Sequence, residues 1–431
     1  MKLIKLITII LLIISINSCA SFSHTNKRLK QPTTSTKATL HISEDRGEKQ
    51  KALFILSLSG GGMRSAYFSA SIMLALETVF KDEGINLLKE VDIISSVSGG
   101  SLPAAYYVIS KDPDDDSGRV VSNRNWEHDI VTDLMSRNYR GKWLGNWFWP
   151  TNIAKYWFTA FDRSDIMAQT FADNMFDRKV FGQDLRFKDI NPERPYLVLN
   201  ATNGTTGSFS SLFRFTKENF EQTINSDINK YKISRAVMAT ASFPAAFNYM
   251  TLKNYHSNNY VHVFDGGNSD NLGLKSVEEI IDINKNKYKK IIVLLVDAYT
   301  KSKGVSPKDY DGRKMLDYAV DLNFIDSSDS LLSNNRDQII KHLITELGGL
   351  GSQHEFVFHH IQFNDISDSD LNKRLNAIKT DFRIRNDASG TGAIEEAVAK
   401  LIVKDNACLN KIKEILLEPT TNYKDTYCTW P

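Results

Sequence analysis

The chain has 431 residues, of which 42% are hydrophobic and 24% charged, a composition typical of a globular protein with enough apolar residues for a large core. Its 53 Lys and Arg residues nearly balance 51 Asp and Glu residues, which leaves a formal net charge of +2. So small a charge gives no strong field to attract nucleic acid or anionic lipid, and we expect no nucleic-acid partner.

The N-terminus has the features of an export signal. Lys2 and Lys5 lead into an apolar stretch at 6–16, which is much shorter than the roughly 20 residues that a transmembrane helix needs. The stretch ends at Ile16-Asn17-Ser18-Cys19, which resembles the bacterial lipobox, where cleavage precedes a Cys that then carries lipid. We therefore predict a lipoprotein signal peptide at 1–18 and an exported protein, anchored through Cys19 to a membrane of the bacterial cell envelope. A plain cleaved signal, with Cys19 unmodified, is the alternative.

Residues 19–51 are polar and lack apolar periodicity, which predicts a lipid-anchored tether. The folded part is expected to begin at Ala52, where an apolar run to Ser59 is followed by glycines and a helical pattern at 65–80. Residues 91–110 repeat this plan of strand, turn and helix. Further strands are predicted at 196–201, 261–264 and 291–296.

Strands that alternate with helices predict an α/β fold, a three-layer α/β/α sandwich with a mainly parallel central sheet. We assign the core to 52–300, with an insertion around 112–189 that interrupts the alternation, and residues 301–431 to a helical extension of the same domain. Cys408 and Cys428 lie near the C-terminus, and an oxidising compartment would allow them to pair. The sequence does not decide whether they do.

Three glycine-rich segments contain the candidate chemistry. Residues 94–101 (ISSVSGGS) predict a strand that turns sharply at Ser98 into a helix, as in the nucleophile elbow G-x-S-x-G, with Ser96 at the first glycine position. Residues 59–65 (SGGGMRS) suit an oxyanion hole better than a nucleotide loop, which would need Gly at Ser65 or a following Lys. Asp265 leaves a predicted strand in residues 263–273 (VFDGGNSDNLG), a pattern also found in simple turns.

The order of these segments resembles the patatin-like phospholipase family, with its glycine-rich oxyanion loop, G-x-S-x-G serine and D-G-G aspartate. Residues 239–247 (ATASFPAAF) are similar to the family segment that precedes the aspartate. The resemblance covers roughly 52–298 and implies a patatin-like fold. It implies a catalytic dyad of Ser98 and Asp265, with oxyanion donors at Gly60, Gly61, Gly62 and Gly99 and supporting residues Arg64, Gly100, Gly266 and Gly267.

A dyad requires no histidine, although His256 and His262 lie near Asp265 in sequence and a Ser-His-Asp triad is the alternative. Arg64 is expected to brace the loop or to pair with a carboxylate rather than to bind a lipid phosphate. We predict no cofactor, and no catalytic metal because no His/Cys cluster has ligand spacing.

Residues 143–161 are unusually aromatic, which fits either a segment that contacts membrane lipid or an insertion packed on the core. The aromatic residues are Trp143, Trp147, Phe148, Trp149, Tyr156, Trp157, Phe158 and Phe161. The resemblance implies a lipid acyl hydrolase of the phospholipase A or lysophospholipase type, with phospholipid or another acyl lipid as substrate. A neutral-lipid lipase, a thioesterase, an acyltransferase and a non-catalytic lipid-binding surface lipoprotein are the alternatives.

Overall fold

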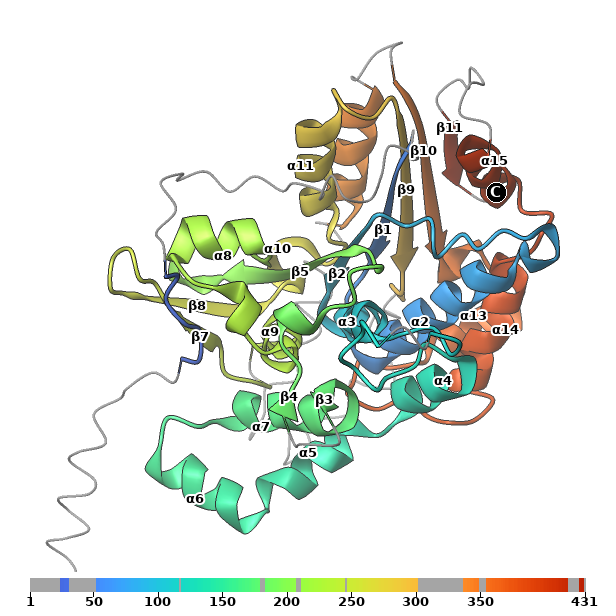
Figure 1. Cartoon of the computed structure of the whole chain (residues 1–431). Helices are drawn as coiled ribbons and strands as arrows, with labels where there is room; N and C mark the ends of the chain where they lie inside the picture. Colours follow the sequence, from blue (N-terminus) through green and yellow to red (C-terminus); the bar gives the residue numbers. More distant parts are fainter. Residues whose placement is uncertain are drawn as a thin grey trace, which may run out of the picture.

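The computed structural model describes residues 24–30, 52–115, 118–178, 183–206, 211–244, 246–300, 336–348, 354–417 and 426–429 (Figure 1). The predicted signal peptide and Cys19 lie outside these residues. Within them, no helix combines the length and the apolar character needed to cross a bilayer.

The centre of the fold is a nine-stranded sheet in the order β11-β10-β9-β1-β2-β5-β8-β7, with β6 also paired to β5. The strands from β11 to β5 are parallel, whereas β6 and β8 run antiparallel to β5 and β7 antiparallel to β8. The sheet is therefore mixed, and the predicted parallel arrangement holds for one side of it. The strands are β1 (Ala52–Leu58), β2 (Ile93–Val97), β5 (Tyr196–Asn203), β6 (Leu212–Phe215), β7 (Met250–Lys253), β8 (Tyr260–Asp265), β9 (Lys290–Asp297), β10 (Glu355–Gln362) and β11 (Thr426–Thr429).

Helices cover both faces of this sheet, because its central strands are buried on both sides. Along β1, Phe54 and Leu56 belong to one apolar cluster, and Leu53 and Ile55 belong to the other. The first cluster is completed by α2 (Gly62–Thr78), α3 (Ser101–Ile109), α9 (Ile233–Thr240), α13 (Ser369–Asn376), α14 (Thr391–Leu401) and α15 (Ala407–Leu417). The second is completed by α11 (Leu274–Asn284) and the helix at 336–348 (Figure 1). The three-layer α/β/α architecture is thus as predicted.

The segment predicted as an insertion is mostly helical and lies below the sheet in Figure 1. It contains α4 (His128–Ser136), α5 (Tyr139–Trp147), α6 (Pro150–Phe158) and α7 (Arg163–Phe171), followed by the short antiparallel pair β3 (Asp177–Arg178) and β4 (Gln183–Asp184). Helices α5 and α7 pack on each other, and α7 also packs on α9. The insertion is therefore attached to the helical layer on the α2 side of the sheet.

Two sequence-based boundaries need correction. The C-terminal part is not only helical, because it supplies β10, which pairs with β9 over eight residues, and β11. Two polar His residues at 359–360 interrupt the apolar run of β10, and for this reason the sequence pattern did not predict the strand. Within the predicted tether, residues 24–30 lie against the fold: Lys253 N–H donates to Asn26 Oδ1 at 2.9 Å, and Leu29 N–H donates to Asn225 O at 3.0 Å.

The register of β5 brings the ends of two other strands together. Val97 at the end of β2 pairs with Asn200, and Asp265 at the end of β8 pairs with the next residue, Ala201. Because β6 pairs with residues 199–202 of β5, β2 and β8 must both lie on the opposite edge of β5. There they run toward each other, so their carboxyl ends meet.

Asn200 ties this junction together. Its side chain is fully buried, and its Nδ2 donates to Ser95 Oγ at 2.9 Å and to Ser96 O at 3.1 Å. Its Oδ1 accepts a hydrogen bond from Ser276 Oγ at 2.5 Å. The amide therefore links β5 to β2 and to α11.

Replacing Asn200 with Ala should lower the free energy of unfolding by about 3 kcal/mol, because buried hydroxyl and carbonyl groups lose their partner. Urea denaturation followed by circular dichroism measures the change. Asn229→Ala, at an exposed position, is the matched control and should change stability by less than about 0.5 kcal/mol. Equal effects of the two substitutions would contradict the role assigned to Asn200.

Candidate active site

Ser98 occupies a strained turn between β2 and α3. Its φ is +48°, in the left-handed region that non-glycine residues seldom adopt, and a short 3-10 turn, Ser98–Gly100, leads directly into α3. The backbone N–H of Ser98 donates to Thr240 Oγ1 at 2.9 Å, which helps hold this conformation. Ser98 is 8% exposed. This is the local geometry of a nucleophile elbow.

Asp265 lies at the end of β8, facing Ser98. Ser98 Oγ donates a hydrogen bond to Asp265 Oδ2 at 2.9 Å, and Gly267 N–H donates to Asp265 Oδ1 at 2.8 Å. Burial raises the pKa of Asp265 from 3.8 to about 6, and these two hydrogen bonds limit the rise. The carboxyl group is thus placed to accept a proton from the hydroxyl near neutral pH.

The segment 239–247 holds the backbone on both sides of this pair. Besides its bond to Ser98 N–H, Thr240 accepts a hydrogen bond from Gly266 N–H through its carbonyl oxygen at 3.1 Å. Ser242 O accepts one from Asp265 N–H at 3.1 Å. The sequence pattern indicated the segment but not the role of Thr240 within it. The only signal for that role was the position of the segment between the Ser98 and Asp265 motifs.

The glycine-rich loop between β1 and α2 lies next to Ser98. A Cβ on Gly60 would come within 2.2 Å of Asn271 Oδ1 and 3.2 Å of Ser98 Cβ. The N–H of Gly60 already donates to Asn271 O at 2.9 Å, so its predicted role as an oxyanion donor is wrong: it shapes the loop. Outside the bonds within helices and strands, the N–H groups of Gly61, Gly62 and Gly99 donate to no backbone acceptor among the described residues, and these three amides remain the candidate oxyanion donors.

Gly62 and Gly99 belong to different motifs but are in contact. A Cβ on Gly99 would lie 2.0 Å from Gly62 O, so this approach of the two loops requires glycine. The two segments that the sequence predicts to stabilise an oxyanion therefore meet beside Ser98.

Arg64 braces the loop from behind, as one of its predicted roles requires. Its side chain is buried, with Nε donating to Ala298 O at 2.9 Å and Nη1 to Ile378 O at 2.7 Å. A few residues farther, Asp381 O accepts a hydrogen bond from Met63 N–H at 2.8 Å. Residues 378–381 thus hold the start of α2, a contact that no local sequence motif indicates.

Ser96, at the first glycine position of the elbow, and Ser65, at the end of the glycine-rich segment, both have hydrogen-bonded hydroxyl groups. Ser101 Oγ donates to Ser96 Oγ at 3.1 Å, within the elbow. Ser65 Oγ donates to Ser59 O, at the start of the glycine loop. Each serine therefore fits its turn through a local hydrogen bond.

Neither histidine of the alternative triad contacts the aspartate. Along β8, His262 alternates with Val263 and Asp265 and so lies on the opposite face, where its Nδ1 is 3.0 Å from Thr251 Oγ1. His256 lies in an exposed turn. In the described part of the chain, Ser98 is the only side chain that hydrogen-bonds the Asp265 carboxylate. In that part, no three His, Cys, Asp or Glu side chains are grouped so as to hold a metal ion.

The aromatic segment divides between the two predicted roles. Trp143 is half-buried and packs against the core, with its ring centroid 5.4 Å from that of Phe247. By contrast, Phe148, Trp149, Trp157 and Phe158 are exposed. Core packing therefore explains only part of the segment.

Cys408 is buried in α15, and Cys428 lies in β11. The side chain of Cys428 is outside what the structure describes, so the pairing that the sequence leaves open falls outside the described residues.

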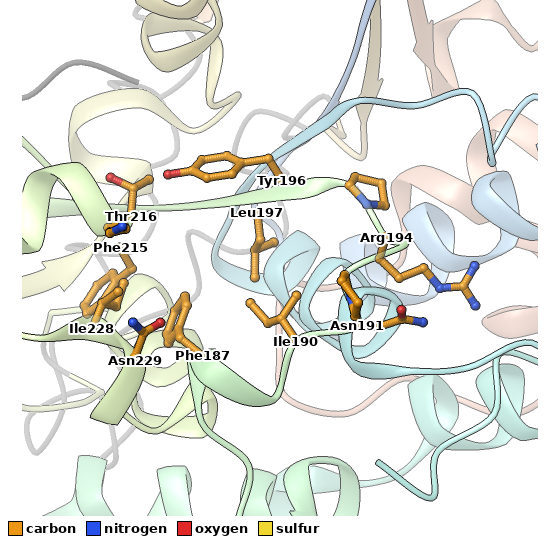
Figure 2. Close-up of a pocket in the computed structure, with 13 residues that line it drawn as sticks. Phe187, Ile190, Asn191, Arg194, Tyr196, Leu197, Phe215, Thr216, Ile228 and Asn229 are labelled. Carbon is orange, nitrogen blue, oxygen red and sulfur yellow. The ribbon is translucent and has the colours of Figure 1, made fainter. Parts of the chain in front are cut away.

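Figure 2 shows a second feature of the surface, a groove of about 230 Å³. Its walls include Tyr196 and Leu197, at the amino end of β5, and Phe187 from the insertion. Tyr196 pairs with Ile93, the first residue of β2, whereas Ser98 follows the last. The groove is therefore at the other end of the strands and is not part of the candidate site.

The comparison with protein families identifies residues 56–277 as a patatin-like phospholipase domain, which is more than half of the chain. The chain belongs to the patatin-like phospholipase family. The domain includes the glycine loop, the Ser98 elbow and Asp265. It does not include β9, β10 or residues 378–381, so the supports of the patatin-like site extend beyond the matched region.

Solved structures similar to this patatin-like protein include VipD from Legionella pneumophila and human GIVD cytosolic phospholipase A2. VipD is 13% identical, with 70% of this chain and 57% of VipD covered and a TM-score of 0.27. The human phospholipase is 11% identical, with 56% and 42% covered and a TM-score of 0.37. This chain thus spans about half the length of these proteins. No curated protein matches it in sequence.

The raised pKa of Asp265 predicts a pH-dependent cost to stability. Between about pH 4 and 6 the folded protein retains a proton that the unfolded chain has released, so stability falls as pH rises through this window. Above pH 6 the ionised carboxylate costs roughly 3 kcal/mol in unfolding free energy. Asp265→Asn should therefore stabilise the protein by about that much more at pH 8 than at pH 4.

Denaturant unfolding of the wild type and the variant at both pH values measures this difference, because groups common to both proteins cancel. Asp297 is also buried but is paired with Arg336 at 2.6 Å, and Asp297→Asn should instead destabilise the protein. An Asp265→Asn effect that is the same at pH 4 and pH 8 would contradict the raised pKa.

Proposed function

We propose that the protein is a lipid acyl hydrolase that cleaves fatty acyl esters of phospholipids or lysophospholipids through Ser98 and Asp265. The observation that carries the proposal is the 2.9 Å hydrogen bond from Ser98 Oγ to the buried carboxyl of Asp265. The family supports the class of substrate, and the strained turn at Ser98 supports its role as nucleophile.

In the proposed first step, Ser98 Oγ attacks the ester carbonyl carbon while its proton passes to Asp265 Oδ2. The tetrahedral intermediate then collapses, its bond to the alcohol oxygen breaks, and the alcohol leaves with the proton from Asp265. Water repeats the two steps on the acyl-enzyme, which releases the fatty acid. Asp265 receives and returns one proton in each half, and a pKa of about 6 suits both transfers.

The charge that develops on the carbonyl oxygen needs donors that are already in place. Gly61, Gly62 and Gly99 supply the three N–H groups that remain candidate donors. Gly61 and Gly62 stand at the N-terminus of α2, whose dipole favours negative charge. We propose that two or more of these amides form the oxyanion hole, with Arg64 as a brace that does not touch the substrate.

Ser98→Ala should lower fatty-acid release from mixed phospholipid micelles by about 10³-fold or more, because it removes the nucleophile. Asp265→Asn should cause a comparable loss by removing the base. His262→Ala is the matched control and should retain activity, since His262 lies on the opposite face of β8.

Labelling with a fluorophosphonate separates the alternatives. A wild type that is labelled at Ser98 but releases no fatty acid from phospholipid would point to a lipase, thioesterase or acyltransferase acting on other substrates. A folded wild type that is neither labelled nor active would favour the non-catalytic lipid-binding lipoprotein.

We also propose that the protein is exported and anchored to the bacterial cell envelope through lipid on Cys19. The lipobox-like residues 16–19 and the short apolar stretch before them support this proposal.

Cys19→Ser should abolish incorporation of an alkyne-labelled fatty acid into the protein when the full chain is expressed in a bacterium. Cys408→Ser, which changes a buried cysteine, is the control and should leave labelling unchanged. Labelling that survives in Cys19→Ser would contradict the anchor.

A further inference from the structure

Helix α6 buries a polar residue and exposes large aromatic side chains to the solvent. Its only buried residue is Asn152, at 1% exposure, whereas Trp157 and Phe158 are 73% and 70% exposed. Phe148 and Trp149, which precede the helix, are 71% and 63% exposed. A helix on the surface of a protein in water normally has the reverse arrangement.

These exposed side chains are gathered on α6 and the turn before it, and we call them the hairpin aromatic surface. Trp149, Ile153 and Trp157 are spaced four residues apart and so follow one side of α6. Phe148 and Phe158 complete the surface at the two ends of the helix. The hairpin of α5 and α6 lies at the lower edge of the molecule in Figure 1, away from the sheet.

The hairpin is held in place by polar contacts beneath this surface. Asn152 Nδ2 donates to Asn146 O at 2.9 Å, and Asn146 Nδ2 donates to Thr170 Oγ1 on α7 at 2.9 Å. Trp143 Nε1 donates to Arg163 O at 3.0 Å. Hydrogen bonds thus attach α5 to α7 and α6 to α5, so the helix that carries the exposed aromatic side chains has a defined support.

We propose that the hairpin aromatic surface docks on the interfacial region of a lipid bilayer. Trp and Phe with neighbouring cations are the side chains that favour this region, and the exposed Lys142 and Lys155 flank the surface. The net charge of +2 gives no long-range attraction to lipid, so apolar insertion has to supply the affinity.

The position of the N-terminal segment favours a bilayer over a protein partner. Asn26 binds Lys253 at one end of β7, and just before the other end Asn248 O accepts a hydrogen bond from Ser164 Oγ, at the start of α7. Four residues lie between Cys19 and His24, so their Cα atoms are at most about 18 Å apart. A lipid on Cys19 would thus hold the protein close to β7, the strand that leads to the base of the hairpin.

The surface is also connected to the candidate active site. Arg140 on α5 pairs with Asp381 at 2.7 Å, and the carbonyl of Asp381 holds Met63 in the loop beside Ser98. Trp143 contacts Phe247, which ends the segment that holds Ser98 and Asp265. Docking would therefore bring a lipid surface to a hairpin whose contacts reach the elements that surround the nucleophile, although the proposal itself does not depend on hydrolysis.

The test uses the full chain with Ser98→Ala, so that the result is independent of catalysis, and vesicles of phosphatidylcholine with or without bromine on the acyl chains. Bromine quenches only tryptophans that reach the acyl region. We expect quenching in this protein and at least a twofold smaller effect in Trp149→Phe/Trp157→Phe. Trp126→Phe removes a buried tryptophan instead and should leave quenching unchanged.

A second variant removes the two phenylalanine side chains from the hairpin aromatic surface and keeps its tryptophans. Phe148→Ser/Phe158→Ser should also reduce quenching at least twofold, since both positions are exposed and the fold should tolerate the changes. Because all variants share one N-terminus, binding through Cys19 is common to them. Equal quenching in the parent and in Trp149→Phe/Trp157→Phe would overturn the proposal. So would a dimer in sedimentation experiments that Phe148→Ser/Phe158→Ser abolishes, which would show that a second copy covers this surface.

Discussion

The site depends on one constraint, the meeting of two strand ends beside β5. The carboxyl end of β2 delivers Ser98 and that of β8 delivers Asp265, opposite successive residues of β5. Neither group is in a relaxed state: Ser98 has a positive φ, and Asp265 is a carboxyl group without a cation among its described partners. Such strain costs on the order of 1–3 kcal/mol per site and persists only where the surroundings fix the geometry. Here Thr240, Gly267 and the sheet register provide that constraint.

The residues that hold the candidate active site come from the whole chain and not from the patatin-like domain alone. Ala298 and Ile378 accept hydrogen bonds from Arg64, and the Asp381 carbonyl accepts one from Met63, although all three lie beyond residue 277, where the family match ends. These contacts fix the turn that presents Gly61 and Gly62. The C-terminal part therefore contributes to the geometry of the loop, and it also extends the sheet through β10.

The sequence predicted the features that depend on local pattern and not those that depend on tertiary contact. The apolar runs predicted five strands near their observed positions, and the family resemblance carried by the glycine-rich segments implied the pair, Ser98 and Asp265, that the structure brings together. The role of Gly60 was mispredicted because its N–H partner, Asn271, is 211 residues away in sequence. Asp381 could not be found for the same reason. Strands β6 and β7 were missed because four-residue strands carry little periodicity.

The hairpin aromatic surface leaves four aromatic side chains exposed although their burial would add to the stability of the fold. Burying one aromatic side chain contributes about 2 kcal/mol, so four exposed ones forgo a large part of the stability of a typical domain. Core packing does not require this arrangement, because Trp143, in the same segment, packs its ring against the buried Phe247 at the edge of the core. The hydrogen bonds of Asn152 and Asn146 also hold the helix that carries the exposed rings. An aromatic surface without a function would not need this support. An exposed aromatic surface that forgoes the free energy of burial and has a defined support is best explained by binding. The acyl lipids expected for a patatin-like enzyme lie in bilayers, whose interfacial region favours such aromatic side chains.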